Sequence, residues 1–92
     1  VCGDEKVLSA PDYWTQDCAA ATQSILLAAH ALGLGAVWLG VYPGKSRIQG
    51  LRKLLGIPPH VTPFALVSVG YPAEEKSPAN RYDPTRAHHD RW

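Results

Sequence analysis

Residues 33–43 read Gly-Leu-Gly-Ala-Val-Trp-Leu-Gly-Val-Tyr-Pro, and they lie within a longer run, Cys18–Gly44, that holds no Asp, Glu, Lys or Arg. A run of this length could cross a bilayer, since about 20 apolar residues suffice for a spanning helix. Polar residues interrupt it at positions 22, 23, 24 and 30, and the glycines at 33 and 35 end any helix partway. The pattern favours a buried helix and a buried strand joined by a tight glycine turn, and it argues against a membrane protein.

An alanine-rich helix is expected before this turn, from about Pro11 to Leu32. Proline is tolerated in the first turn of a helix, and the acidic Asp12 suits the helix dipole there. Small and large apolar residues occur on all its sides, which predicts a helix that is buried nearly all round. Small side chains let another backbone approach closely, so two uses stay open: a self-paired helix at a dimer interface, and a central helix inside one subunit.

The segment Ala36–Val41 predicts a short strand. It is apolar at every position except its glycine, as expected for a strand covered on both faces. A second helix is expected from about Lys45 to Leu55, with apolar residues at 48, 51 and 55 on one face and basic residues at 45, 47, 52 and 53 in water. Gly56 then ends this helix.

A second strand is expected over Thr62–Val69. Beyond it the composition changes, because residues 73–92 are polar and spaced by prolines, with no hydrophobic period. This predicts an extended C-terminal arm that is either loose or laid across another surface. Tyr82 and Trp92 favour the second reading, since aromatic side chains are costly to leave in water.

Length and composition limit the chain to one small domain. Of its 92 residues 46% are hydrophobic, which is ample for a core and suggests that a partner covers part of the apolar surface. The formal net charge of +1, with no basic cluster, argues against nucleic-acid binding. Cys2 and Cys18 lie far apart and show no metal-ligand spacing, so nothing supports a disulfide, and free thiols in a cytoplasmic protein are the favoured reading. Val1 reads as the tail of a strand, so we expect a portion of a longer protein.

No arrangement of side chains for acid–base or nucleophilic catalysis stands out, so no catalytic residue is assigned. The segment His88-His89-Asp90 resembles a metal cluster at first sight. Adjacent histidines in an extended tail point in opposite directions and lack a spaced third ligand, so no metal site is expected. His30, among alanines and leucines, is read as a core or interface histidine.

Five residues are left as candidates for binding a cofactor. Trp38, Leu39 and Gly40 offer an apolar platform and, at the glycine, accessible main-chain N–H groups. Lys76 and Arg81 offer positive charge suited to a phosphate. These residue types suit a flat, phosphate-bearing cofactor that supplies the chemistry itself. A hydrophobic strand beside a glycine is also common in ordinary cores.

The order of four segments resembles the C-terminal half of FMN-dependent nitroreductase-family proteins. The segments are YWTQDCAAATQSILLAAHALGLGAVWLG at 13–40, LLGIP at 54–58, GYPAEEK at 70–76 and RYD at 81–83. The resemblance covers almost the whole chain. Each piece alone is a weak signal, and their combination is specific.

The resemblance implies an α+β fold with a mixed β-sheet flanked by helices, of which residues 1–92 form the C-terminal part of a single domain and residues 73–92 an arm. It implies a homodimer through the helix Tyr13–Leu32, with FMN at the interface and NAD(P)H as co-substrate. Leu39 and Gly40 would place main-chain groups beside the reactive edge of the flavin, and Trp38 would shape the wall of that pocket. Arg81, and less surely Lys76, would neutralise the phosphate.

One departure from the family pattern is that the Arg- and Ser-rich segment near the family's N-terminus has no counterpart here. The chain is therefore expected to be a trimmed product, one part of a longer protein, or a fragment without activity of its own. The predicted function of the parent protein is FMN-dependent reduction of nitroaromatics, quinones or similar small acceptors by NAD(P)H. The alternatives are a non-catalytic dimerisation or flavin-binding fragment, and a related flavin enzyme for dehalogenation or flavin breakdown.

Overall fold

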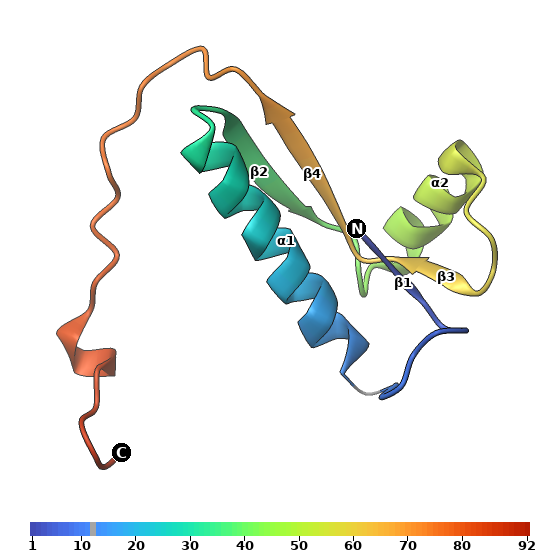
Figure 1. Ribbon diagram of the computed structural model, residues 1–92, viewed down its shortest axis with the longest axis horizontal. Helices are drawn as coiled ribbons and strands as arrows, with labels where there is room; N and C mark the ends of the chain where they lie inside the picture. Colours follow the sequence, from blue (N-terminus) through green and yellow to red (C-terminus); the bar gives the residue numbers. More distant parts are fainter. Residues whose placement is uncertain (12) are drawn as a thin grey trace.

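A long helix lies along one face of a two-stranded antiparallel sheet and forms the body of the protein (Figure 1). The structure, a computed structural model, describes residues 1–11 and 13–92. Helix α1 spans Trp14–Ala31. Strand β2, Gly35–Gly40, pairs with β4, Ala65–Gly70, so that Gly35 is opposite Gly70 and Gly40 is opposite Ala65.

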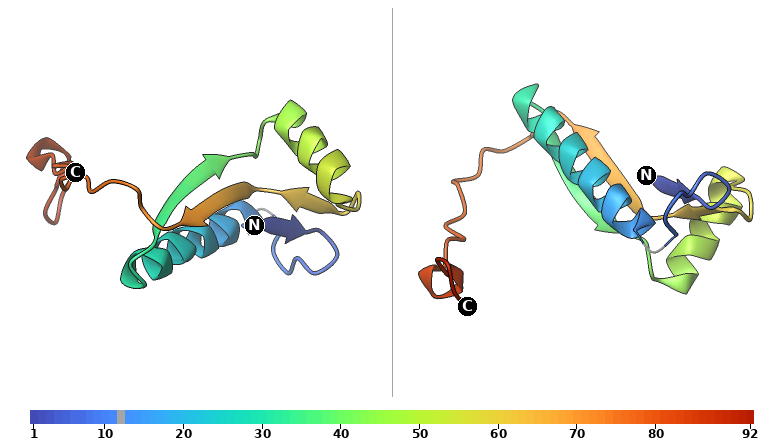
Figure 2. Two further views of the ribbon diagram at one scale, coloured as in Figure 1. Left: turned by 90° about the horizontal axis from the view of Figure 1, so that it is seen from above. Right: turned by 60° about the horizontal axis from the view of Figure 1, so that its bottom comes forward.

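A second small sheet and a second helix lie at one end of this body (Figures 1 and 2). Strand β1, Cys2–Asp4, pairs antiparallel with β3, Val61–Pro63. Helix α2, Lys45–Leu55, comes between β2 and β3 in the chain, and its bounds and its glycine cap at Gly56 agree with the prediction. The α+β class is confirmed. Both pairings in the described part of the chain are antiparallel, so it contains no parallel pair of the kind that a mixed sheet requires.

The glycine turn after α1 forms as the sequence predicts. Gly33 has a φ of 73°, in the left-handed region that glycine adopts without strain. Its N–H donates to the carbonyl of His30 at 3.0 Å, and the N–H of Leu34 donates to the carbonyl of Ala29 at 2.9 Å. These two bonds satisfy carbonyls that the end of a helix leaves free. They turn the chain directly from α1 into β2.

The start of α1 differs from the prediction. The helix begins at Trp14 and not at Pro11, with Tyr13 as its N-cap. The N–H of Tyr13 donates to the carbonyl of Ala10 at 3.1 Å, so a turn precedes the helix. The acidic residue expected in the first turn, Asp12, lies outside the described residues.

Helix α1 is covered on one side, which corrects the expectation of burial nearly all round. Its buried residues, Cys18, Thr22 and Ala29, are spaced so that they share one face. The opposite side is open, and Leu27 is 61% exposed. The reason is that a sheet of only two strands contacts a single face of the helix.

Strand β2 is covered on one face only, although its apolar sequence predicts cover on both. Residues directly opposite each other in an antiparallel pair point to the same face, so Trp38 and Val67 share one face while Leu39 and Leu66 share the other. Val37 and Leu39 are 51% and 45% exposed. The apolar sequence of β2 makes both of its faces suitable for burial. Among the described residues, no element covers the face that carries Val37 and Leu39.

The predicted strand Thr62–Val69 is two strands, because the chain changes partner at Phe64. The carbonyl of Phe64 accepts hydrogen bonds from the N–H groups of Val41 and Tyr42, at 3.2 and 3.0 Å. Its own N–H donates to the carbonyl of Val1 at 2.9 Å. Residues before Phe64 therefore pair with β1 and residues after it with β2.

An aromatic cluster joins the two halves of the structure at this point. The ring of Trp14 packs edge-on against those of Tyr42 and Phe64, with centroids 4.9 and 6.0 Å apart. Trp38 reaches Phe64 from β2 at 5.9 Å. Edge-on aromatic pairs of this kind add about 0.5–1.5 kcal/mol beyond the area that they bury. The cluster fixes α1 against both sheets.

Residues 73–92 leave the body beyond β4 and extend away from it (Figures 1 and 2). They hold one short 3-10 turn, η1, at Pro84–Arg86, whose N–H at Thr85 is capped by Asp83 at 3.0 Å. The radius of gyration is 16.6 Å, against about 12 Å for a compact domain of this length. In the part of the chain that the structure describes, neither helix combines the length and apolar character needed to span a membrane.

Candidate functional site

Gly40 presents its main-chain polar groups at the outer edge of β2. Its neighbour Val41 donates its N–H toward β4, to Phe64. Successive residues of an antiparallel strand alternate between facing the partner strand and facing away from it. Gly40 therefore directs its N–H and C=O outward, and Arg47 Nη1 donates to this carbonyl at 2.8 Å. By the same alternation the main-chain groups of Leu39 face β4, so Gly40 is the residue of the pair with an accessible N–H.

Leu39 and Trp38 lie on opposite faces of the sheet. Leu39 points to the open face, where it is opposite Leu66. Trp38 is half-buried, and its ring contacts Phe64 in the aromatic cluster. Trp38 is thus absent from the residues that line the groove beside Leu39. Its expected role at the wall of a cofactor pocket stays a prediction.

A groove of about 560 Å³ lies between the end of β2 and helix α2. Leu39, Leu51 and Leu66 supply apolar side chains, while Gly40 and Gly50 are among the residues that supply main chain. The single charged residue in its lining is Arg47. The groove is wide enough for a flat ligand, since small-molecule pockets range over about 300–1,000 Å³.

Arg47 and Gly50 were not predicted as site residues. The charge of Arg47 predicts a side chain in water, although Arg47 lies one turn before Leu51 on the same side of the helix. The turn over 41–44 instead brings the first turn of α2 back to β2, where Arg47 meets Gly40. A Cβ added at Gly44 would lie 3.4 Å from Cδ of Arg47, so the stem of this arginine passes close over the turn. The spacing of seven residues between Gly40 and Arg47 does not by itself predict the contact, because the contact depends on the turn over 41–44.

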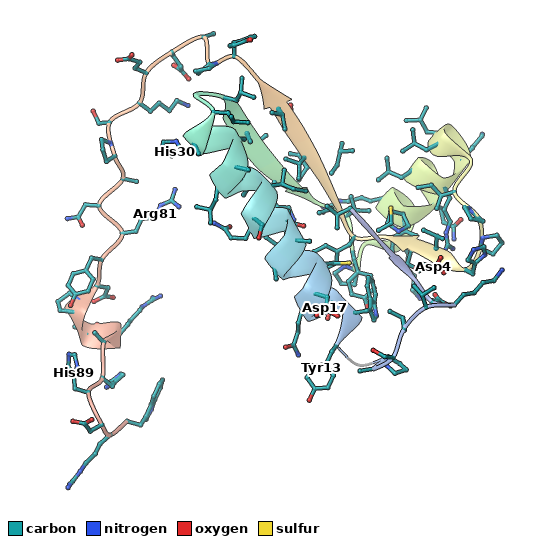
Figure 3. All side chains as sticks on the ribbon, viewed as in Figure 1. Asp4, Tyr13, Asp17, His30, Arg81 and His89 are labelled. Atoms are coloured by element: carbon teal, nitrogen blue, oxygen red, sulfur yellow. The ribbon has the colours of Figure 1, made fainter. Side chains whose placement is uncertain are left out.

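Lys76 and Arg81 lie far from Gly40 within one chain. Lys76 pairs with Glu74 at 2.9 Å, with both side chains exposed, and it lines a cleft of about 420 Å³ beside Gly33. This cleft is at the Gly35 end of β2, about 17 Å along the strand from Gly40. Arg81 is exposed on the extended tail (Figure 3). A single chain therefore does not bring the two cations to the main chain of Gly40, and their role at a phosphate stays a prediction.

The titratable groups form no second site in the described part of the chain. Residues 1–11 and 13–92 contain no cluster of three or more His, Cys, Asp or Glu side chains that could hold a metal ion. His88 instead stacks on Trp92, with ring centroids 4.6 Å apart, while His89 lies on the same exposed tail (Figure 3). Burial raises the pKa of the Cys18 thiol, which makes it a poor nucleophile near neutral pH.

Comparisons with known proteins agree with this arrangement of elements. A sequence model of the nitroreductase family matches residues 7–71. The chain is 51% identical over 92 residues to a protein of Methanothermobacter thermautotrophicus described as "Putative NADH dehydrogenase/NAD(P)H nitroreductase", covering all of this chain and 48% of that protein.

Solved structures extend the comparison to the fold. A protein of the same description from Parabacteroides distasonis is 44% identical, with a TM-score of 0.90 over 99% of this chain and 53% of that one. An FMN-dependent nitroreductase from Clostridium difficile is 28% identical, with a TM-score of 0.85 over 99% of this chain and 55% of that one. The chain thus spans about half the length of the relatives it matches. Since the family model matches most of its residues, this chain belongs to the nitroreductase family.

Proposed function

We propose that the whole protein containing this chain is an FMN-dependent oxidoreductase that uses NAD(P)H to reduce small acceptors such as nitroaromatics or quinones. Membership of the nitroreductase family supports an oxidoreductase. The names of relatives support NADH or NADPH as the electron donor, and the C. difficile protein supports FMN as the cofactor. We keep a cytoplasmic location as part of this proposal, on the sequence argument alone.

The observation that carries the proposal is the open main chain of Gly40 beside an apolar groove. A flavin ring is flat and apolar with polar edges, so it needs a smooth surface and a few aimed N–H donors. Leu39 and Leu66 offer the surface, since 45% and 44% of their area is exposed, and Gly40 offers an outward N–H. When bound, FMN supplies two-electron chemistry, taking a hydride equivalent from NAD(P)H and passing electrons to the acceptor.

The role of these residues is to bind and orient. A main-chain N–H held in a hydrogen-bonded strand does not reorient during a reaction, so it stabilises negative charge at a fixed place. The apolar side chains of Leu39 and Leu66 exclude water from the same face. No side chain in the described groove is required to act as an acid or base.

The proposal also includes a homodimer that completes the site. Gly40 and Lys76 line different clefts of one chain, and a second copy would be a way to bring the cations of one chain to the main chain of the other. The open side of α1 is a suitable interface, since Leu27 is exposed there among small residues. Burial of such an apolar face would contribute about 25 cal/mol for each Å² removed from water.

The experiment is purification of the whole protein, followed by absorbance spectroscopy and native mass measurement. We expect a dimer with bound FMN whose absorbance near the flavin band bleaches with NAD(P)H in the absence of oxygen. Absence of flavin after incubation with excess FMN would refute the proposal.

The exposed position of Arg81 on the extended tail also favours a second candidate, a non-catalytic dimerisation or flavin-binding fragment. Arg81→Ala separates the two functions. For the enzyme we expect FMN affinity to fall at least tenfold, because a charge-assisted hydrogen bond contributes about 1.5–3 kcal/mol. Arg91→Ala, near the end of the same tail, is the matched control and should leave the affinity unchanged. Equal affinities in the two variants would favour the non-catalytic fragment.

A further inference from the structure

The guanidinium of Arg47 lies at the same edge of β2 as the outward N–H of Gly40. Arg47 Nη1 donates to the carbonyl of Gly40 at 2.8 Å, and this contact fixes its position. In an antiparallel strand the N–H and C=O of one residue point to the same side, because a residue exchanges both of its main-chain bonds with one neighbouring strand. An acceptor atom bound to the N–H of Gly40 would therefore lie beside the guanidinium.

The charge of Arg47 is not balanced by a carboxylate among the described residues. The ion pairs found among residues 1–11 and 13–92 join Lys76 to Glu74 and Arg86 to Asp83. Arg47 is also the single charged residue in the lining of the groove between β2 and α2. Because an arginine side chain is always charged in proteins, this edge of the groove carries a full positive charge.

A fixed positive charge at this edge distinguishes the two redox states of a bound flavin. A hydride equivalent brings two electrons and one proton, so the reduced ring carries one negative charge more than the oxidised ring. The guanidinium attracts this added charge, and the attraction is stronger once the ring covers the groove and excludes water from it. The reduced ring should therefore bind more tightly than it would without Arg47.

We propose that Arg47 is a positioning residue that raises the reduction potential of the flavin. The inference rests on the proposed function and assigns to a residue of α2 a part in its redox step. No second ligand is involved, so the surface of Leu39 and Leu66 remains the one that we assign to the flavin ring. A higher potential increases the driving force for reduction of the flavin by NAD(P)H.

The test is an anaerobic redox titration of the whole FMN-loaded protein against a dye of known potential. We expect Arg47→Gln, which removes the charge and keeps an N–H donor, to reduce the preference for reduced over oxidised FMN about tenfold. For a two-electron couple this corresponds to a fall of about 30 mV in the midpoint potential. Arg47→Lys, which keeps the charge, should retain most of the preference.

Lys45→Gln is the matched control, because it removes the same charge from the same helix. Lys45 lines a different cleft, with Tyr42 and Gln49 among its neighbours there. The substitution should leave the midpoint potential unchanged. A potential that does not change in Arg47→Gln, or that falls equally in Lys45→Gln, would overturn the inference.

A purely structural role of Arg47 would give another result. Loss of the contact with Gly40 alone would weaken the binding of oxidised and reduced FMN by the same factor, and the potential would not move. For a variant that binds FMN weakly, the ratio of the dissociation constants for oxidised and reduced FMN measures the same preference. Circular dichroism and native mass measurement establish that the variants compared are folded and have the same oligomeric state.

Failure of the proposed function has a different signature. A protein that binds no FMN refutes the flavin enzyme before the redox titration begins. A protein that binds FMN with a potential independent of Arg47 refutes the role of Arg47 alone.

Discussion

Replacement of Gly50 by alanine is expected to stabilise the protein and to weaken ligand binding at once. The position is in the interior of α2, and the new Cβ meets no atom within 4 Å. Removing the glycine should therefore raise the free energy of unfolding by about 1 kcal/mol, through the conformational entropy of the unfolded chain. The same methyl group adds volume to the lining of the groove that we assign to the flavin, so the affinity for FMN should fall.

Gly56→Ala is the matched variant at the end of the same helix. Gly56 has a φ of 64°, where alanine costs roughly 1–2 kcal/mol, and it lies outside the groove lining. The two substitutions are chemically identical and should change stability in opposite directions. Both changes are measured by urea unfolding of the whole protein, monitored by circular dichroism, with the protein concentration held the same for each variant. A loss of stability in Gly50→Ala would refute the reasoning, because it would show that another part of the protein packs against this glycine.

Three further outcomes follow from the contacts described above. Gly33→Ala should lower the free energy of unfolding by roughly 1–2 kcal/mol, because its φ of 73° disfavours a Cβ, and urea unfolding measures this. Arg52→Met should destabilise by about 1–3 kcal/mol in the same assay, since Arg52 Nη2 donates to the carbonyls of Pro59 and Val61 at 2.9 and 3.1 Å. Lys53→Met, next to it and exposed, should change stability by less than about 0.5 kcal/mol. In timed alkylation followed by peptide mass mapping, exposed Cys2 should react well before Cys18, whose thiol is buried and whose pKa is raised; equal rates would contradict the burial.

Local signals explain why α2 and the turn after α1 were predicted from the sequence. Helix α2 has an apolar period, a glycine at each end and prolines beyond it, and these features depend only on neighbouring residues. The turn at Gly33 is of the same kind, since its left-handed backbone requires a residue without Cβ. Elements specified by nearby residues can be predicted without knowledge of the rest of the fold.

The break at Phe64 could not be predicted, because it depends on distant parts of the chain. The residues over 62–69 favour an extended strand throughout. The strand divides only because Val1 and Val41 approach Phe64 from two directions. The predicted burial of β2 on both faces is wrong for a similar reason. The apolar sequence of β2 says that its faces can be buried, and which face is buried depends on where α1 lies.

The candidate site was predicted in part. The strand that carries Leu39 and Gly40 was predicted, and the role of the outward N–H of Gly40 as a donor to a cofactor stays a prediction. Arg47 was missed because helical periodicity assigns a residue to the side of its own helix and does not say which strand that side approaches. The position of Arg81 follows from the path of the tail, which no local pattern specifies (Figure 3).

The outer edge of β2 has a consequence for how this protein associates with other chains. A strand with an unpaired row of N–H and C=O groups is a template onto which another extended segment can add. Arg47 already occupies one acceptor in this row, at the carbonyl of Gly40, and its charge opposes the approach of a second strand. Neutralising this arginine should therefore promote self-association through strand addition. A charged side chain at the edge of a strand thus acts as a gatekeeper against aggregation.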